Sequence, residues 1–310
     1  MKTPELVQKK KKTKQPSPTI ILEQFTDKIE EDHNIIFKPN VGPQTDFLAA
    51  SEREVLYGGS AGGGKSYAML ADPLRFMDVP AFAGVLLRHT TEELRELITK
   101  SQEMYPKIWP GIKWSERKMT WTAPSGATLW LSYLDKDQDV TRYQGLAFSW
   151  IGFDELTQWA TPFAWNYMRS RLRSADPELP LCMRATTNPG GRGHHWVKKM
   201  FIDPAPAGKS YIATDIDTGE QLKYPAGHAK AGKPLFKRRF IPARLRDNPY
   251  LAEQGDYEAM LLSLPEQQRR QLLDGDWDIK EGAAFTEFDR KVHVVEPFDI
   301  PNNWVKFRSC

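Results

Sequence analysis

The stretch that decides the fold is GGSAGGGKSYAML, residues 58–70, in which five glycines precede a single lysine. Gly59, four intervening residues, Gly64, Lys65 and Ser66 fill the pattern G-x-x-x-x-G-K-[ST]. Small residues in this pattern let successive backbone N–H groups point into one concavity, and that concavity fits phosphate. The stretch therefore predicts a phosphate-binding loop.

The segments on either side of this loop support the prediction. REVLYGG before it has the short apolar run of a buried strand, and SYAMLADPLRFM after it predicts a helix whose N-terminus adds its dipole to the site. A flexible glycine-rich turn is the alternative, but such a turn does not require a Lys-Ser pair at the entry of a helix. Pro73 lies well inside the predicted helix, so we expect that helix to kink or end early.

The residue types of the loop have defined roles in binding a nucleotide. The Lys65 ammonium would neutralise the β- and γ-phosphates, and the Ser66 hydroxyl would ligate Mg²⁺. ATP and Mg²⁺ are therefore the predicted cofactors. The nucleotide-binding residues expected in the loop are Gly59, Ser60, Ala61, Gly62, Gly63, Gly64, Lys65 and Ser66.

The composition bounds the class of protein. A length of 310 residues is enough for about two domains. The charged fraction of 27% and the mean hydropathy of −0.56 are typical of soluble globular proteins, and no apolar run approaches the roughly 20 residues of a membrane span. Cys182 and Cys310 are too few for a disulfide framework or a zinc site, which indicates a reducing cytoplasm. Because the net charge is only +3, any basic surface for nucleic acid must be local.

Strand and helix signals alternate along the body of the chain. Thr90 and Glu93 fit a capping box at the start of one helix, and a second helix is expected over about 162–173. KMTWTA and ATLWLSYL predict a β-hairpin. This alternation predicts an α/β fold with a mainly parallel sheet flanked by helices. Three further apolar runs predict strands: AGVLLR (83–88), SWIGF (149–153) and LCMRATT (181–187).

Shifts in composition predict the domain organisation. Residues 1–20 combine a lysine run with Pro and Ser, which is typical of a disordered basic tail. The nucleotide-binding core is expected over 21–202, and the Gly-, Pro- and Lys-rich segment 203–240 is expected to form a loop or insertion with a returning strand. Residues 241–290 predict a lid or helical linker with two helices broken at Pro265, and 291–310 begin a strand of a further, truncated domain.

Two adjacent carboxylates follow the apolar strand WIGF. Asp154 would hold Mg²⁺ through its hydration shell, and Glu155 would polarise a water molecule for attack on the γ-phosphate. An acidic pair is common by chance. Its place at the end of an apolar strand, about 90 residues after the phosphate loop, favours a Walker B motif.

Polar residues also follow the strand LCMRATT. Thr186, Thr187 and Asn188 would lie at a neighbouring strand end, where short side chains can sense the γ-phosphate and move when it leaves. An ordinary Asn-Pro-Gly turn is the alternative. Upstream of the loop, the carboxamide of Gln44 could recognise the donor and acceptor edges of adenine.

These motifs, taken in order, resemble the large subunit of the DNA-packaging terminases of tailed bacteriophages. The resemblance runs from about Pro39 to the C-terminus. It rests on PQTDFL, YGGSAGGGKS, LLRHTTEEL, TRYQGLAFSWIGFDE, ATTNPGG, FIPARLRDNPYL and LLDGDWD, of which the last two are more specific than the Walker motifs.

The resemblance implies a P-loop ATPase of the additional-strand class in which the Thr-Thr-Asn element couples hydrolysis to movement of double-stranded DNA. It also implies a homo-oligomeric ring, commonly a pentamer, on the portal of an empty procapsid, and a small terminase subunit as partner. The expected location is the cytoplasm of an infected bacterial host. In the family, the strand begun over 291–310 leads into an RNase H-like nuclease whose first metal-binding aspartate is expected just past Cys310, so DNA cleavage is not expected of this chain.

Two arginines could stabilise charge on the transferred phosphoryl group. Arg142 matches the family's arginine shortly before the Walker B strand, which reaches the nucleotide of a neighbouring subunit. Arg88, at the end of its own strand, is the alternative and is a further nucleotide-binding candidate. A finger that acts in trans needs a surface loop, which favours Arg142.

Two other functions use the same motifs. A helicase-like nucleic-acid remodelling ATPase shares the phosphate-loop chemistry, but it should carry a second motor domain and unwind duplexes. A non-catalytic scaffold module would use nucleotide only to stabilise its fold. The Walker B carboxylates, Asp154 and Glu155, argue against that module.

Overall fold

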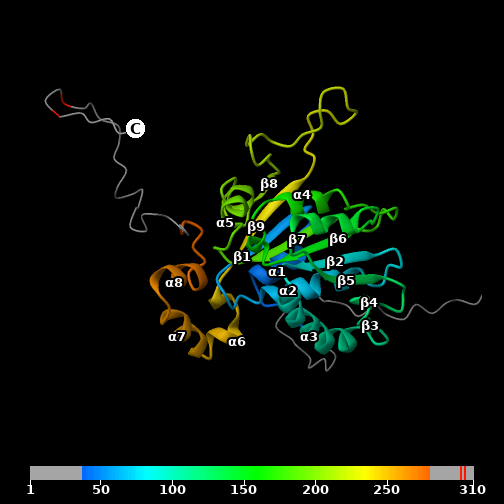
Figure 1. Ribbon diagram of the computed structural model, residues 1–310, viewed down its shortest axis with the longest axis horizontal. Helices are drawn as coiled ribbons and strands as arrows, with labels where there is room; N and C mark the ends of the chain where they lie inside the picture. Colours follow the sequence, from blue (N-terminus) through cyan, green and yellow to red (C-terminus); the bar gives the residue numbers. More distant parts are fainter. Residues whose placement is uncertain (1–36, 280–300, 302–303, 305–310) are drawn as a thin grey trace, which may run out of the picture. The chain divides into compact units, whose positions relative to one another are not determined.

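A nine-stranded sheet forms the centre of the fold within the described part of the chain (Figure 1). The computed structural model describes residues 37–279, 301 and 304, and the segment up to Ile279 belongs to one compact unit. The prediction of a basic tail over 1–20 lies outside the described residues, as does nearly all of the predicted truncated domain over 291–310.

The strands follow the order β3-β4-β5-β2-β6-β7-β1-β9-β8 across the sheet. From β5 to β9 every neighbouring pair is parallel, whereas β3, β4 and β8 add antiparallel edges. The prediction of a mainly parallel α/β sheet is therefore confirmed. The strands are β1 (Glu54–Gly59), β2 (Ala83–Arg88), β3 (Lys113–Ser115), β4 (Thr120–Thr122), β5 (Thr128–Tyr133), β6 (Trp150–Asp154), β7 (Cys182–Thr187), β8 (Ser210–Ile212) and β9 (Lys237–Ala243).

The strand order identifies the subclass of the fold. β1 leads into the phosphate loop and β6 leads into the acidic pair, and β7 lies between them. An extra strand between these two is the mark of the additional-strand class of P-loop ATPases, as expected. β9 pairs with β1 on its other side, so the sheet is not complete at residue 202, where the sequence placed the end of the core.

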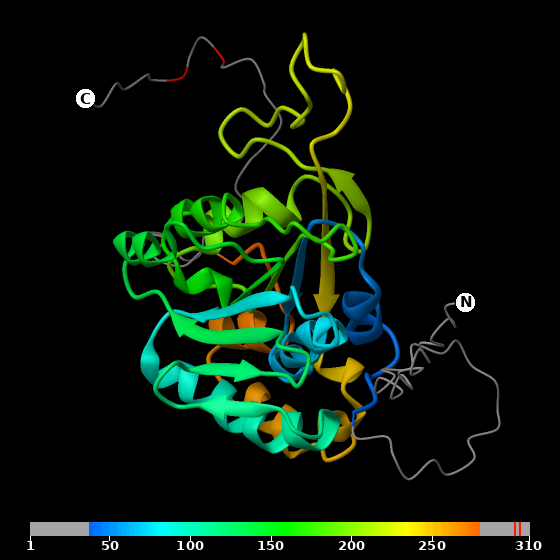
Figure 2. The ribbon, with the colours of Figure 1, turned by 90° about the vertical axis from the view of Figure 1, so that its right-hand side faces the viewer.

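Helices cover both faces of the sheet (Figures 1 and 2). Alternate residues of a strand face opposite ways. Thus Val55 and Tyr57 of β1 pack with α1, α2 and α3, whereas Leu56 packs with α4 and α5. The helices are α1 (Pro43–Ala49), α2 (Lys65–Ala71), α3 (Thr91–Ile108), α4 (Phe163–Arg169), α5 (His194–Val197), α6 (Pro249–Ala252), α7 (Asp256–Leu262) and α8 (Glu266–Leu272). None of the described helices is long and apolar enough to cross a membrane.

Local sequence signals fix several helix boundaries. α2 ends at Ala71, and a 3₁₀ helix over Asp72–Phe76 follows, so Pro73 ends the helix early as expected. The capping box of α3 is present, since the Thr90 hydroxyl accepts from the Glu93 amide and the Glu93 carboxylate accepts from the Thr90 amide, each at 3.3 Å.

The prediction of two helices after β9 is wrong in number. Three short helices, α6 to α8, occupy this segment. Gly255, with a φ of 70°, separates α6 from α7, and Pro265 separates α7 from α8. A left-handed backbone at one glycine ended a helix that the apolar pattern alone would have continued.

Candidate nucleotide-hydrolysis site

The phosphate loop joins β1 to α2 in a backbone conformation that requires glycine. Gly59, Gly62 and Gly64 all have positive φ values, of 143°, 77° and 75°. A Cβ atom on Gly59 would lie 2.2 Å from the Ala243 carbonyl oxygen of β9. The loop is thus held against β9, and the Ser60 amide donates to that same carbonyl at 2.8 Å.

Lys65 is buried at the start of α2, and its ammonium group points back over the loop. Its Nζ donates to the Ser60 carbonyl oxygen at 2.7 Å and to the Asn188 Oδ1 at 2.7 Å. Burial lowers the pKa of Lys65, while the charges of Glu155 and Asp154 act in the opposite direction. The ammonium therefore lies close to both carboxylates of the acidic pair.

The acidic pair lies where β6 ends. Asp154 is buried, and Glu155 has a φ of 59°, a left-handed conformation that is uncommon for a residue with a side chain and is often found at functional sites. Burial, and secondly the charge of Asp154, raise the pKa of Glu155. A carboxylate with a raised pKa is a stronger base, which suits the activation of a water molecule.

The end of β7 connects the lysine to the acidic pair. The Thr186 hydroxyl donates to Asp154 Oδ1, and the Asn188 amide donates to the Glu155 carboxylate at 3.4 Å. The Asn188 side chain also accepts from Lys65. Thus three neighbouring strands, β1, β7 and β6, bring the loop, the Thr-Thr-Asn element and the acidic pair into direct contact.

Thr187, the middle residue of this element, faces another partner. Its hydroxyl lies 2.7 Å from the Thr157 hydroxyl, and it accepts from the Thr157 amide at 3.2 Å. Thr157 follows the acidic pair closely in the chain, so Thr187 ties the end of β7 to the segment after β6. Thr157 was not predicted, because a threonine within a short connection carries no signal by itself.

Arg88 enters the same site from the end of β2. Its Nε lies 2.8 Å from Asp154 Oδ2, but neither atom has a hydrogen-bond partner. Arg88 and Asp154 thus form an ion pair whose geometry is not that of a hydrogen bond. A buried carboxylate oxygen with no hydrogen-bond donor, next to the loop that carries Ser66, fits an Mg²⁺ site.

The donor set is also consistent with this metal. Within residues 37–279, 301 and 304, no three His, Cys, Asp or Glu side chains gather into a metal site. Mg²⁺ usually keeps several water ligands and is bound by one or two protein groups together with phosphate oxygens. Ser66 and Asp154 are the residues that would hold it.

Gln44 lies on α1, directly against the phosphate loop. Its Nε2 donates to the Gly64 carbonyl oxygen at 2.9 Å, and its Oε1 accepts from the Asn40 amide at 2.6 Å. Both ends of the carboxamide are therefore bonded to the backbone of this chain. Gln44 therefore lies at the site, where its side chain holds the phosphate loop by a hydrogen bond. Its contact with adenine stays a prediction.

Arg142 lies outside this cluster, on an exposed 3₁₀ helix over Asp137–Tyr143. Its guanidinium carbon is 5.1 Å from the ring centroid of Tyr133, an NH2 group donates to the Tyr133 carbonyl at 2.8 Å, and Asp139 is its ion-pair partner at 3.5 Å. None of these contacts is to the loop or the acidic pair. Of the two arginines, Arg88 is thus placed within the site and Arg142 on the surface.

The segment 245–279, which lies within the predicted lid or helical linker, also contacts the site, through hydrogen bonds that were not predicted. The Asn248 side chain donates to the Gly62 carbonyl at 2.7 Å, and the Ala61 amide donates to the Leu272 carbonyl at 2.7 Å. Gln271 donates to the Pro189 carbonyl at 2.7 Å, directly after the Thr-Thr-Asn element. The motifs DNPYL and LLDGDWD, which contain Asn248 and Leu272, were the only sequence signal for these contacts.

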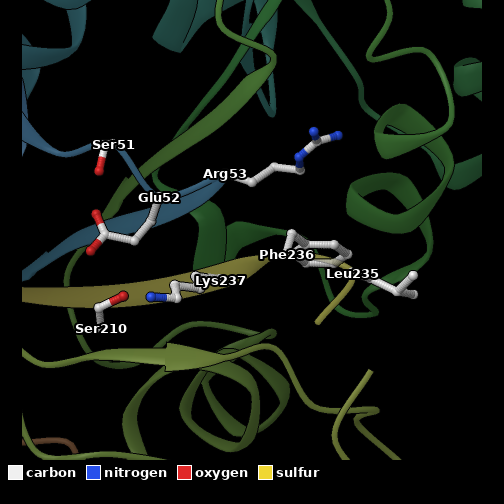
Figure 3. A pocket seen from close by; sticks show the side chains of 7 residues that line it. All are labelled: Ser51, Glu52, Arg53, Ser210, Leu235, Phe236 and Lys237. Atoms are coloured by element: carbon white, nitrogen blue, oxygen red, sulfur yellow. The ribbon is translucent and has the colours of Figure 1, made fainter. Parts of the chain in front are cut away.

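A cavity of about 440 Å³ lies at the other end of the sheet (Figure 3). Residues before β1 and at the start of β9 line it, whereas the phosphate loop follows the end of β1. The cavity is therefore separate from the nucleotide site. Its lining residues are Ser51, Glu52, Arg53, Ser210, Leu235, Phe236 and Lys237.

Solved structures with a similar fold are large terminases. The large terminase of a thermophilic bacteriophage in complex with ADP has a TM-score of 0.57 and 18% sequence identity, and the match covers 85% of this chain and 60% of that protein. A mutant of the large terminase ATPase domain of Thermus phage P74-26 has a TM-score of 0.51 and 12% identity, with 79% and 96% of the two chains covered. The chain thus spans 60% of the length of the ADP-bound terminase. These likenesses concern the fold.

The family is established by sequence. No curated protein matches the chain. The family described as "Terminase large subunit, T4likevirus-type, N-terminal" matches residues 56–292, which include the loop, the acidic pair, the Thr-Thr-Asn element and the segment 245–279 that contacts them. The chain therefore belongs to the terminase large subunit family, of which it carries the N-terminal ATPase portion.

Proposed function

We propose that this chain is the Mg²⁺-dependent ATPase motor of viral DNA packaging, which couples ATP hydrolysis to the translocation of double-stranded DNA into a procapsid. The observation that carries the proposal is the convergence of Lys65, Asp154, Glu155 and Asn188 at the ends of three adjacent strands. A module that only binds nucleotide would need the loop, but it would not need Glu155 as a base beside it.

The side chains divide the reaction between them. The loop amides and Lys65 bind the phosphates, and Glu155 takes a proton from the attacking water molecule. Mg²⁺, when bound near Ser66 and Asp154, neutralises charge on the phosphate oxygens. Asn188 loses Lys65 as its donor when that ammonium turns to the phosphates.

The segment 245–279 is the proposed lid, because it contacts both the loop and the residue after Asn188. A shift of Asn188 would move Pro189, whose carbonyl accepts from Gln271 on α8. The change at the γ-phosphate would therefore reach the lid through one hydrogen bond. This path is a chain of direct contacts: Lys65 bonds to Asn188, and the next residue, Pro189, accepts from Gln271.

The proposed partners are those of a packaging motor. They are double-stranded viral DNA, the portal of the procapsid and a small terminase subunit, within the cytoplasm of the infected host. The working assembly is a homo-oligomeric ring, commonly a pentamer in this family, while the chain alone is a monomer. Any sequence must pass through such a motor, so contacts to the phosphate backbone should dominate over contacts to bases.

Arg142 is proposed as the arginine finger that acts on a neighbouring subunit. We expect Arg142→Ala to lower the ATPase rate about tenfold. The loss is smaller than the roughly 10³-fold or more of a permanently docked finger, since only assembled subunits present it. In a mixture of Arg142→Ala with Glu155→Gln, each kind of subunit supplies what the other lacks, so we expect activity to return.

The control for this experiment is Arg117→Ala, which removes another exposed arginine and should leave the rate unchanged. If the mixture of the two variants stays inactive while both assemble, Arg142 does not act in trans. The finger would then be Arg88, which already contacts Asp154.

The motor function is tested by measuring ATP hydrolysis with Mg²⁺ over a range of protein concentrations, with and without double-stranded DNA. A rate per subunit that rises with concentration and with DNA supports a motor completed by its neighbours. Displacement of a third strand from a triplex tests translocation, and duplex unwinding would instead indicate a helicase. Turnover that is absent under all of these conditions, including with portal added, would contradict the proposal.

A further inference from the structure

An arm extends from the sheet between β8 and β9, at residues 213–236 (Figures 1 and 2, yellow-green to yellow). It holds three lysines and three acidic residues, and we call it the basic arm because its second half, 221–236, carries all three lysines and no acidic residue. Backbone hydrogen bonds give the arm a defined structure: the Leu222 amide donates to the Ala213 carbonyl at 2.7 Å, and the Tyr224 amide donates to the Lys233 carbonyl at 3.0 Å. Two turns result, over 215–220 and 225–232. The basic arm is thus an ordered projection, stabilised by hydrogen bonds within its own backbone.

The charges of the basic arm are segregated between the two turns. From Gln221 to Ala243 the chain contains no Asp or Glu. No ion pair joins any of the arm's lysines to another part of the described chain. The acidic residues all belong to the first turn: Asp215, Asp217 and Glu220. The exposed lysines of the second half are Lys223, just before the second turn, Lys230 and Lys233, and Lys237 follows at the start of β9.

Aromatic stacking supports the second turn. Tyr224 stacks on His228 with ring centroids 4.5 Å apart and an interplanar angle of 17°, and the Lys230 ammonium lies 5.8 Å from the Tyr224 ring centroid. The ring stack orders the turn, and the Lys230 ammonium adds a cation–π contact with Tyr224 while it stays exposed to solvent. Lys230 is therefore held on an ordered turn with its charge accessible.

The chemistry of the basic arm fits a polyanion rather than another protein. Protein interfaces are depleted of lysine and enriched in aromatic residues at their centres, whereas interfaces with DNA are strongly positive and polar. Leu235 is the arm's exposed large apolar residue within the described chain. Lysine ammonium groups bind phosphates as point charges and do not select a base sequence.

The position of the basic arm suits a motor. β9 begins at the foot of the arm and ends at Ala243, whose carbonyl accepts from Ser60 in the phosphate loop at 2.8 Å. β9 also pairs in parallel with β1, from Arg238 to Ala243. The arm therefore lies at the sheet edge opposite the nucleotide, and one strand connects the two.

We propose that the basic arm is a contact for the phosphate backbone of double-stranded DNA, independent of base sequence. The inference rests on the proposed motor function, for which it names a DNA-binding surface. Neutralising the lysines should weaken DNA binding and reduce its salt dependence, because each lost phosphate contact lowers the slope of log K against log salt by about 0.9.

The test compares the triple variant Lys223→Gln, Lys230→Gln and Lys233→Gln with a matched control. The control carries Lys107→Gln, Lys113→Gln and Lys118→Gln, three exposed lysines on α3 and the antiparallel edge of the sheet, and it makes the same change in net charge. Binding of a fluorescent duplex is measured by anisotropy over a salt series. We expect the arm variant to lose about tenfold or more in affinity near 0.1 M salt and two to three units of slope.

A second variant tests the opposite sign. Asp217→Asn with Glu220→Gln removes two exposed negative charges from the first turn, so the affinity for the duplex should rise. All variants should keep the DNA-independent ATPase rate of the natural chain, because none of these residues contacts the nucleotide site. Circular dichroism and light scattering confirm the fold and the mass.

The outcomes separate the two proposals. If the natural chain binds duplex and the arm variant binds as the control does, the arm inference is overturned and the motor function stands. If the natural chain hydrolyses ATP but binds no duplex under any condition, the DNA function and the arm inference both fall. If the arm variant changes the oligomeric mass, the arm is a contact between subunits, and the inference is also overturned.

Discussion

Replacing Glu155 with Gln is expected to lower kcat for ATP hydrolysis by about 10²- to 10⁴-fold while ATP still binds. The substitution keeps the shape of the side chain but removes the base that accepts a proton from the attacking water. It also removes the repulsion between two neighbouring carboxylates, since the negative charge of Asp154 raises the pKa of Glu155. The fold should therefore be at least as stable as before. Phosphate release in a single turnover and binding of a fluorescent ATP analogue measure the two effects separately.

Glu103→Gln provides the control for this experiment. It makes the same carboxylate-to-amide change at an exposed position of α3, and it should keep the full rate. If the Glu155 variant retains more than about a tenth of the natural kcat, Glu155 is not the general base. Loss of ATP binding in that variant would instead assign Glu155 to the binding of nucleotide or metal.

Replacing Lys65 with Ala should abolish productive nucleotide binding. Hydrogen bonds to charged groups contribute about 1.5–3 kcal/mol each, so loss of the ammonium from two phosphates should raise the Kd for ATP about a hundredfold or more. Hydrolysis at ordinary ATP concentrations would then be undetectable. Isothermal titration with ATP and Mg²⁺ gives the Kd directly.

The Lys65 variant also needs a test of folding. The substitution leaves the Asn188 side chain and the Ser60 carbonyl without their buried donor and takes a compensating positive charge away from Glu155. Lys65→Met keeps most of the side-chain volume, and thermal unfolding of both variants shows whether the domain persists. ATP affinity equal to that of the natural chain in a folded variant would refute the assignment of the phosphate loop.

Local patterns were sufficient to predict the strands that carry the site and the residues that end them, whereas the short edge strands β3 and β8 were not predicted. WIGF and LCMRATT are continuous apolar runs typical of strands buried on both faces, and the polar residues after each run had to lie at the sheet edge. The phosphate loop was equally predictable, since its glycines are required by positive φ values within one short segment. Each of these signals lies within a few residues of the structure that it specifies.

Contacts between distant segments could not be predicted in this way. Asn188 accepts from Lys65 across 123 positions of the chain, and the Ala61 amide reaches the Leu272 carbonyl. The strand order that places β7 between β1 and β6 depends on how helices pack on the two faces. Gln44 shows the same limit, because only the packing of α1 on the loop reveals that its carboxamide bonds to the backbone.

The hydrogen bond between Lys65 and Asn188 has a thermodynamic consequence. A phosphate group that takes the ammonium must first displace Asn188, so the free energy of that bond is subtracted from the affinity for ATP. Linkage is reciprocal: whatever draws Asn188 away from Lys65 tightens the binding of ATP by the same factor that ATP loosens Asn188. A load on the lid, transmitted from Gln271 to Pro189, would then be measurable as a change in the ATP dissociation constant.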